Sequence, residues 1–100
     1  MLTHVVMWKF KDAEGKTKAE NIEIVKEGLE NLLGAVSVLE DIRFYKNEVA
    51  CDRNFDAMLI VKVQDETALD AYKNHPAHRA VAAYVVKVTD GRAAADTFAL

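Results

Sequence analysis

The chain of 100 residues contains one cysteine, one proline, four glycines and no long apolar run. Cys51 has no partner for an intrachain disulfide, so a reducing, cytoplasmic setting is expected. The scarcity of glycine and proline excludes collagen-like and low-complexity chains. Lys9 and Lys11 interrupt the apolar start, so no secretory signal is expected. No stretch approaches the roughly 18 apolar residues that cross a bilayer, so no membrane partner is expected.

The charge balance excludes a further class of partner. The chain has 13 Lys and Arg against 16 Asp and Glu, a net charge of -3, and no segment concentrates basic residues. Nucleic-acid binding depends on concentrated positive charge, so no nucleic-acid partner is expected. Glycine-rich phosphate loops are also absent, and no cofactor is expected. With 51% hydrophobic and 29% charged residues, the composition is that of a folded protein, and residues 1–100 are expected to form a single domain.

Four segments are predicted to be strands because their apolar residues alternate with a period of two. They are residues 2–11, 38–45, 55–63 and a weaker, alanine-rich segment at 93–98. The first and third of these segments carry apolar residues on both faces, as expected of a sheet that is covered on both sides. The more apolar of the two faces of the first strand carries Leu2, His4, Val6, Trp8 and Phe10.

A first helix is predicted over residues 17–33. Thr17 and Glu20 have the spacing of a capping box, in which each side chain bonds to the backbone N–H of the other residue. Gly34 follows, and glycine is the preferred residue just after a helix. The inner face is predicted from residues that repeat at helical spacing, namely Ile22, Val25, Leu29, Leu32 and Leu33.

A second helical region is predicted to be broken in two by Pro76. Asp65 is positioned to cap the first part, which carries Tyr72 inward and ends near Asn74. Proline lacks an N–H and disfavours the helical conformation at His75, yet it suits the first position of a new helix. That new helix is predicted to close at Asp90-Gly91. Its inner face is predicted to carry His78, Val81, Ala82, Val85 and Val88.

The element order β-α-β-β-α-β predicts an α+β fold of the ferredoxin-like type, a four-stranded antiparallel sheet with helices on one face. Two helices cover only one face of such a sheet. The other face leaves apolar residues such as Val5, Met7, Met58 and Ile60 in water, more than a monomer usually exposes. A second subunit packed sheet against sheet removes this patch, so a two-fold homodimer is expected.

Three side chains are candidates for acid/base chemistry. The kink at His75-Pro76 is predicted to bring Tyr72 and His78 together, and His4 joins them if its strand face looks toward the helices. The positive end of the helix dipole is expected to keep His78 neutral, so that it can take a proton. Tyr72 is expected to orient that histidine or to polarise a carbonyl oxygen, and His4 to assist. Other residues expected to line the pocket are Trp8, His75 and Val81.

Structural explanations for the same residues stay open. His78 is also explained as a partly buried residue at a helix start, Tyr72 as a core residue, and His4 as a partner of a backbone group. His75 and His78 at i, i+3 allow a metal site, but no third ligand is apparent, so no metal is expected. Cys51 stands among acidic residues, which raise a thiol pKa, and is interpreted as incidental.

Two segments carry a resemblance to a known family. His4-Val5-Val6-Met7-Trp8-Lys9-Phe10-Lys11 and Tyr72-Lys73-Asn74-His75-Pro76-Ala77-His78, with Phe55-Asp56 opening the third strand, resemble the stress-responsive A/B barrel domain (Dabb) family. The resemblance covers essentially the whole chain. It implies a dimeric α+β barrel of ferredoxin-like subunits. Plant relatives include a polyketide cyclase that uses no cofactor, and its acid/base residues correspond to His4, Tyr72 and His78.

Three functions remain open from the sequence. The first is a cofactor-independent lyase, cyclase or isomerase acting on a carbonyl or polyketide-like compound, with His78 as base, Tyr72 stabilising an enolate and His4 assisting. The second is a non-catalytic stress-response protein that binds a small apolar ligand or none. The third is a domain that only assembles larger oligomers.

Overall fold

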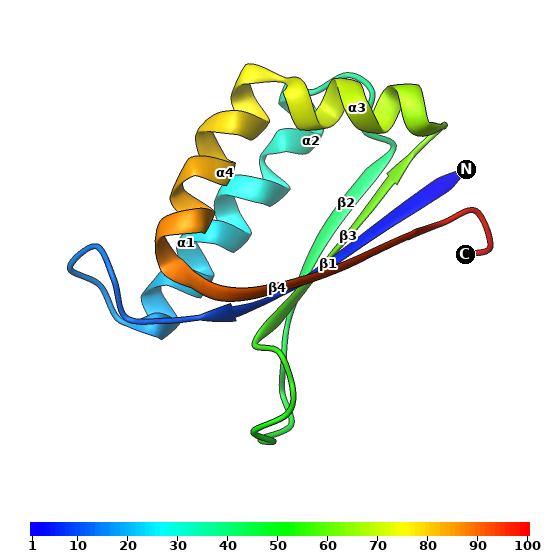
Figure 1. The fold of residues 1–100 in the computed structure, drawn as a ribbon. Coiled ribbons are helices and arrows are strands. Elements are labelled where there is room, and N and C mark those ends of the chain that lie inside the picture. Colours follow the sequence, from blue (N-terminus) through cyan, green and yellow to red (C-terminus); the bar gives the residue numbers. More distant parts are fainter.

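The strands and helical regions follow one another in the predicted order, and each helical region consists of two consecutive helices (Figure 1). A computed structural model describes all 100 residues. The elements are β1 (Leu2–Phe10), α1 (Lys18–Glu30), α2 (Leu32–Ala35), β2 (Asp41–Lys46), β3 (Ala57–Val63), α3 (Glu66–Asn74), α4 (Pro76–Val88) and β4 (Thr89–Thr97).

The strands form one antiparallel sheet in the order β2-β3-β1-β4, which is the ferredoxin-like arrangement predicted from the sequence. The helices lie together on one side of the sheet and leave the other side open, as Figure 1 shows. β1 is a central strand: Val6 is opposite Leu59 of β3 and opposite Ala94 of β4.

The core lies between the helices and the sheet. All five residues predicted for the apolar face of β1 are buried there, from Leu2 to Phe10, and none is more than 6% exposed. Because the side chains of a strand alternate between its two faces, this burial fixes His4 on the helix side. The helices contribute the predicted residues Val25 and Leu29 from α1 and Val85 and Val88 from α4.

The predicted helix starts are confirmed. The Thr17 hydroxyl accepts the Glu20 N–H at 3.2 Å, and the Glu20 carboxylate accepts the Thr17 N–H at 2.9 Å, which completes the capping box. Asp65 accepts the N–H of Ala68 at 2.9 Å and caps α3. Pro76 is the first residue of α4.

The prediction of one helix over 17–33 closed by Gly34 is wrong. α1 ends at Glu30, and Gly34 lies inside α2 without a positive φ, so it is not a left-handed cap. The short turn of α2 redirects the chain so that Leu32 is buried, whereas Leu33 is 45% exposed. Helical periodicity continues through the break, which explains why the sequence predicted a single helix.

The other boundary errors are at strand starts. Asp90-Gly91 do not close α4, because the helix ends at Val88 and passes directly into β4, where both residues lie. The Thr89 hydroxyl donates to the Val85 carbonyl at 2.8 Å and supplies the hydrogen bond that a separate cap would give. β4 therefore starts four residues before the predicted segment 93–98. β2 and β3 start later than predicted, at Asp41 and Ala57.

Asn21 at the start of α1 is fully buried and connects three segments. Its amide donates to the carbonyls of Lys11 at 3.0 Å and Ala13 at 3.2 Å, and its oxygen accepts the Tyr84 hydroxyl of α4 at 2.6 Å. Buried polar groups are costly when they lose their partners. Asn21 therefore fixes the β1-α1 connection to both helices.

We expect Asn21→Ala to lower the free energy of unfolding by about 2–4 kcal/mol, because it removes three hydrogen bonds and leaves the Lys11 carbonyl and the Tyr84 hydroxyl without the partner that Asn21 supplies. Tyr84→Phe is the matched control and removes only one of these hydrogen bonds, so its expected cost is about 1 kcal/mol. Urea denaturation followed by circular dichroism measures both. Equal losses in the two variants would contradict this role of Asn21.

Candidate functional site

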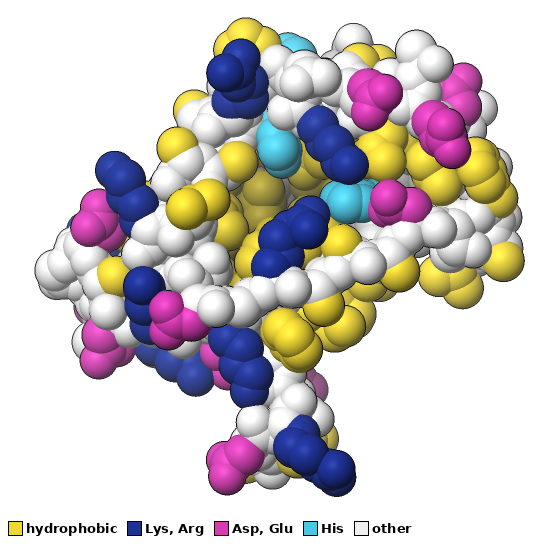
Figure 2. Space-filling view, viewed as in Figure 1, with side chains coloured by type: hydrophobic (Ala, Val, Ile, Leu, Met, Phe, Trp, Pro, Cys, Tyr) yellow, Lys and Arg dark blue, Asp and Glu magenta, His cyan; other side chains and the backbone are white.

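A cavity of about 360 Å³ opens between α4 and the helix side of the sheet. Figure 2 shows the hollow, with an apolar floor, histidine side chains on its wall and basic side chains at its rim. Its floor comes from β1, α1, β3 and α4 and includes Val6, Trp8, Leu29, Leu59 and Val85. The size and the mostly apolar lining with a few polar groups are typical of small-molecule sites.

The break at Pro76 places Tyr72 and His78 against each other. Tyr72 lies near the end of α3 and His78 in the first turn of α4, and their ring centroids are 4.5 Å apart with the planes tilted by 56°. His75 between the two helices adopts an extended conformation, as expected of a residue before proline. Both rings line the cavity, together with His4.

Tyr72 carries the unpaired hydroxyl of the site. The residue is 1% exposed, and its hydroxyl is buried without a hydrogen-bond partner. Burial raises the pKa of Tyr72 far above its ordinary value of 10.0, so the group remains a neutral O–H donor. Buried hydroxyls in folded proteins nearly always have a partner, so an unpaired one beside a cavity indicates a position for a ligand oxygen.

His78 is held as a neutral imidazole with one nitrogen free. Burial lowers the pKa of His78 below its ordinary value of 6.5 and outweighs the hydrogen bond to the Lys73 carbonyl, which favours the protonated ring. Its Nδ1 lies 2.9 Å from the carbonyl oxygen of Lys73, which only accepts, so Nδ1 carries the proton and Nε2 has the free lone pair. Burial is thus a cause of neutrality that the sequence analysis did not consider, and the group that orients the ring is the Lys73 carbonyl, which leaves Tyr72 the alternative role of polarising a carbonyl oxygen.

His4 forms a pair that the sequence analysis missed. β1 and β4 place His4 opposite Asp96, and the Asp96 carboxylate accepts a short hydrogen bond from Nδ1 of His4. This leaves Nε2 of His4 as its second hydrogen-bonding position. His4 and Asp96 are 92 residues apart in sequence, and their contact depends on the register between β1 and β4, which local patterns do not predict. Alternation along β4 shows only that Asp96 shares a face with Arg92 and Ala94.

Of the other residues expected to line the pocket, only Trp8 does so. Its ring stacks on Phe44 at a centroid distance of 6.3 Å and forms part of the floor. His75 points elsewhere, because its Nδ1 accepts the N–H of Ala77 at 3.0 Å and caps α4. Val81 packs against Gly28 of α1, where a Cβ would lie 3.3 Å from its Cγ1, so it fixes the contact between the two helices.

The structure contains no group of three or more His, Cys, Asp or Glu side chains placed to hold a metal ion. Cys51 is exposed in the connection between β2 and β3. No helix has both the length and the apolar character needed to span a membrane.

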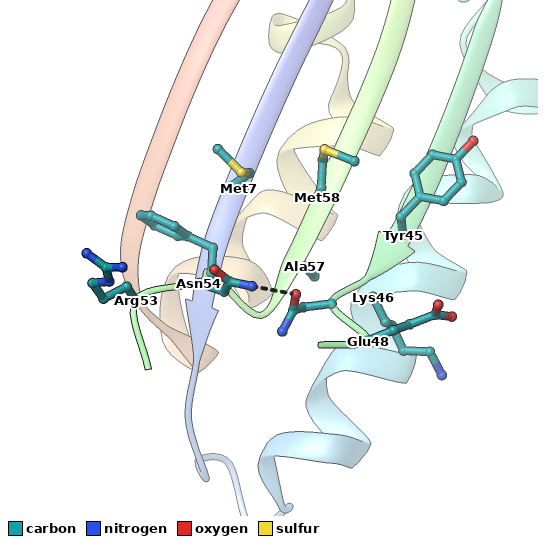
Figure 3. Close-up of a pocket in the computed structure, with 10 residues that line it drawn as sticks. Met7, Tyr45, Lys46, Glu48, Arg53, Asn54, Ala57 and Met58 are labelled. Carbon is teal, nitrogen blue, oxygen red and sulfur yellow. Dashed lines mark hydrogen bonds between the residues drawn. The ribbon is translucent and has the colours of Figure 1, made fainter. Parts of the chain in front are cut away.

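A second hollow, of about 480 Å³, lies on the open side of the sheet. Figure 3 shows Met7, Met58 and Tyr45 projecting from three neighbouring strands, with the helices behind the sheet. Charged and amide side chains of the following connection, including Glu48 and Arg53, surround its lower end. The histidines lie on the opposite side of the sheet, so this hollow is separate from the candidate site.

Comparison with known proteins gives a family and a fold. The family model described as Stress Responsive A/B Barrel Domain matches residues 2–99. A dimeric ferredoxin-like protein of unknown function from Thermobifida fusca has a TM-score of 0.82 and 23% identity over 96% of this chain and 88% of that chain. A Dabb family protein from Mesorhizobium loti has a TM-score of 0.78 and 17% identity over 99% and 96%.

The hydroxynitrile lyase from Passiflora edulis has a TM-score of 0.81 and 9% identity over 96% of this chain and 90% of that chain. Identities at this level show a common fold and carry no activity from one protein to another. Among curated protein sequences, none matches this chain.

The lowered pKa of His78 makes stability depend on pH. Unfolded chains bind a proton at His78 near pH 6.5, whereas the folded protein binds it only at lower pH, so the unfolded state holds more protons between these values. We therefore expect stability to fall as pH decreases through this range, and His78→Gln to reduce that fall. Urea denaturation at about pH 7.5 and about pH 5.5 measures it.

The control for this measurement is Val86→Ala, which changes another residue that lines the cavity and removes no titratable group. The pH-dependent change in Val86→Ala is expected to match the native chain. A His78→Gln variant with an undiminished loss of stability would contradict the burial of a neutral His78.

Proposed function

The chain belongs to the stress responsive A/B barrel domain (Dabb) family, and on this premise we propose that it is a homodimer whose cavity carries out acid/base chemistry on a small carbonyl compound without a cofactor. The observation that carries the proposal is the meeting of three polar side chains at one apolar cavity. His4, Tyr72 and His78 each have a hydrogen-bonding position with no partner in the chain. These free positions can form hydrogen bonds with the polar atoms of a substrate.

In the proposed reaction His78 acts as the general base. Its Nε2 takes a proton from the carbon next to the substrate carbonyl, and the electrons of the broken C–H bond move to the carbonyl oxygen. The Tyr72 O–H donates a hydrogen bond to the enolate oxygen that forms, in surroundings from which water is largely excluded. The enolate then attacks a second carbonyl, expels a leaving group or is reprotonated at another carbon. These outcomes correspond to a cyclase, a lyase and an isomerase.

His4 supplies a second nitrogen and Asp96 is its positioning residue. The Asp96 carboxylate accepts from Nδ1, so it fixes the ring and the tautomer of His4 and directs Nε2 away from the β4 edge. In this proposal, Nε2 of His4 donates to or accepts from the substrate when His78 has taken a proton. Trp8 supplies an apolar surface against which a ring or chain packs.

The homodimer is proposed to form through the open side of the sheet. Val5, Met7, Met58 and Ile60 are only half-buried there, and Tyr45 is 44% exposed. At the edge of the same region, the C-terminal residues Phe98 and Leu100 are 59% and 74% exposed. Structural relatives are described as dimeric, and a second copy with two-fold symmetry would cover this apolar face.

We propose that residues 1–100 form one domain, since the family model spans nearly all of them. A cytoplasmic location suits the exposed, unpaired Cys51. A role in stress responses is a hypothesis that rests on the family description.

A charge on the open face is expected to separate the dimer. Val5→Glu places a carboxylate between the uncharged residues Ile60 and Ala95 in the interface, where it has no partner, and we expect a dimer dissociation constant at least a hundredfold higher. Size-exclusion chromatography with light scattering should give twice the chain mass of 11.2 kDa for the native sequence and 11.2 kDa for the variant. Ala83→Glu, on the exposed side of α4, is the matched control and should remain dimeric. A monomeric native chain would contradict the proposal.

Proton abstraction is testable before a substrate is known. In deuterated water, 4-phenyl-2-butanone exchanges the protons next to its carbonyl, and we expect the protein to accelerate this exchange as followed by NMR. His78→Ala should lower the rate by roughly a hundredfold or more, and Tyr72→Phe by roughly tenfold. His75→Asn, which changes a histidine outside the cavity, should leave the rate unchanged.

The same experiment separates the non-catalytic alternative. Trp8 is the only tryptophan and lines the cavity, so a change in its fluorescence reports binding of the ketone. Binding without accelerated exchange would favour a ligand-binding protein and contradict the acid/base proposal. Exchange that persists in His78→Ala would contradict the role of His78.

A further inference from the structure

Arg92 lies at the rim of the cavity, at the end away from His4. It is paired with Trp8 across β1 and β4, so its side chain shares the helix side of the sheet with Trp8 and lines the same cavity. Basic side chains lie at the rim of the hollow in Figure 2. A positive charge therefore stands beside an otherwise apolar floor.

The charge of Arg92 is not neutralised within the chain. Six pairs of a Lys or Arg with an Asp or Glu lie within 4.0 Å of each other, and Arg92 belongs to none of them. Asp90, the acidic residue nearest in sequence, also lines the cavity, but its carboxylate pairs with Lys11 at 3.1 Å. The guanidinium is therefore the unpaired charge at this end of the site.

Spacing along β1 relates this charge to the reacting groups. His4 and Trp8 are four residues apart, which is about 13 Å along a strand. Because Arg92 is opposite Trp8 and has a long side chain, its guanidinium can approach the reacting groups more closely than that. Val6 and Leu59 lie on the floor between the two ends.

We propose that the substrate or ligand of this cavity is a small carboxylic acid with an apolar or aromatic body, whose carboxylate binds Arg92 while its carbonyl reaches Tyr72 and His78. This inference rests on the proposed function and adds the substrate class. The planar guanidinium matches the two oxygens of a carboxylate. The cavity volume of about 360 Å³ suits an acid of this size.

A pair of probes that differ only in charge tests the proposal. 5-Phenylpentanoate and its uncharged amide, 5-phenylpentanamide, are titrated into the native dimer while the fluorescence of Trp8 is followed. We expect the carboxylate to bind about fivefold to tenfold more tightly than the amide at low salt, and added salt to reduce this preference. Arg92→Gln should abolish the preference and leave binding of the amide unchanged, which also shows that the cavity is intact.

Arg79→Gln is the matched control because it removes the same charge from an exposed residue of α4 that does not line the cavity. Its preference for the carboxylate should equal that of the native chain. Equal binding of both probes by the native chain, or a preference that persists in Arg92→Gln, would overturn the role of Arg92 and leave the proposed function standing. If neither probe changes the fluorescence of Trp8, the small-molecule cavity itself is contradicted, and both proposals fail.

Discussion

Pro76 determines how the candidate site is assembled. It lacks the N–H that would continue α3 and holds His75 in an extended conformation, so the chain turns between Tyr72 and His78 and brings their rings to a centroid distance of 4.5 Å. The same turn exposes the carbonyl of Lys73 to Nδ1 of His78. A continuous helix would use that carbonyl for its own hydrogen bonds. Pro76 therefore accounts both for the contact between the rings of Tyr72 and His78 and for the proton on Nδ1 of His78.

The second requirement is that α4 passes into β4 without a loop. Because β4 begins at Thr89, directly after the helix, it runs along β1 and places Arg92 beside Trp8 and Asp96 beside His4. One strand thus supplies the Arg92 guanidinium at one end of the cavity and the partner of His4 at the other. Burial lowers the pKa of His78 and raises that of Tyr72, so His78 stays neutral and Tyr72 stays protonated.

Local signals in the sequence predicted much of this structure. The capping residues Thr17 and Asp65, the break at Pro76 and the alternation along β1 are decided by neighbouring residues, and each was found. The position of Asp96 was missed because it depends on the pairing of the first and last strands. The break between α1 and α2 and the direct passage from α4 to β4 were missed because tertiary packing overrides the preferences of Gly34 and Gly91.

The proposed chemistry requires a free Nε2 lone pair on His78 beside the unpaired hydroxyl of Tyr72. The nitrogen chemical shifts of the imidazole ring, measured at neutral pH by long-range nitrogen-proton NMR, report which nitrogen carries the proton. We expect a protonated Nδ1 and an unprotonated Nε2 for His78, with Nδ1 of His4 also protonated beside Asp96. A proton on Nε2 of His78, whether as the other tautomer or as imidazolium, would contradict it, because the base would then have no lone pair for a substrate proton.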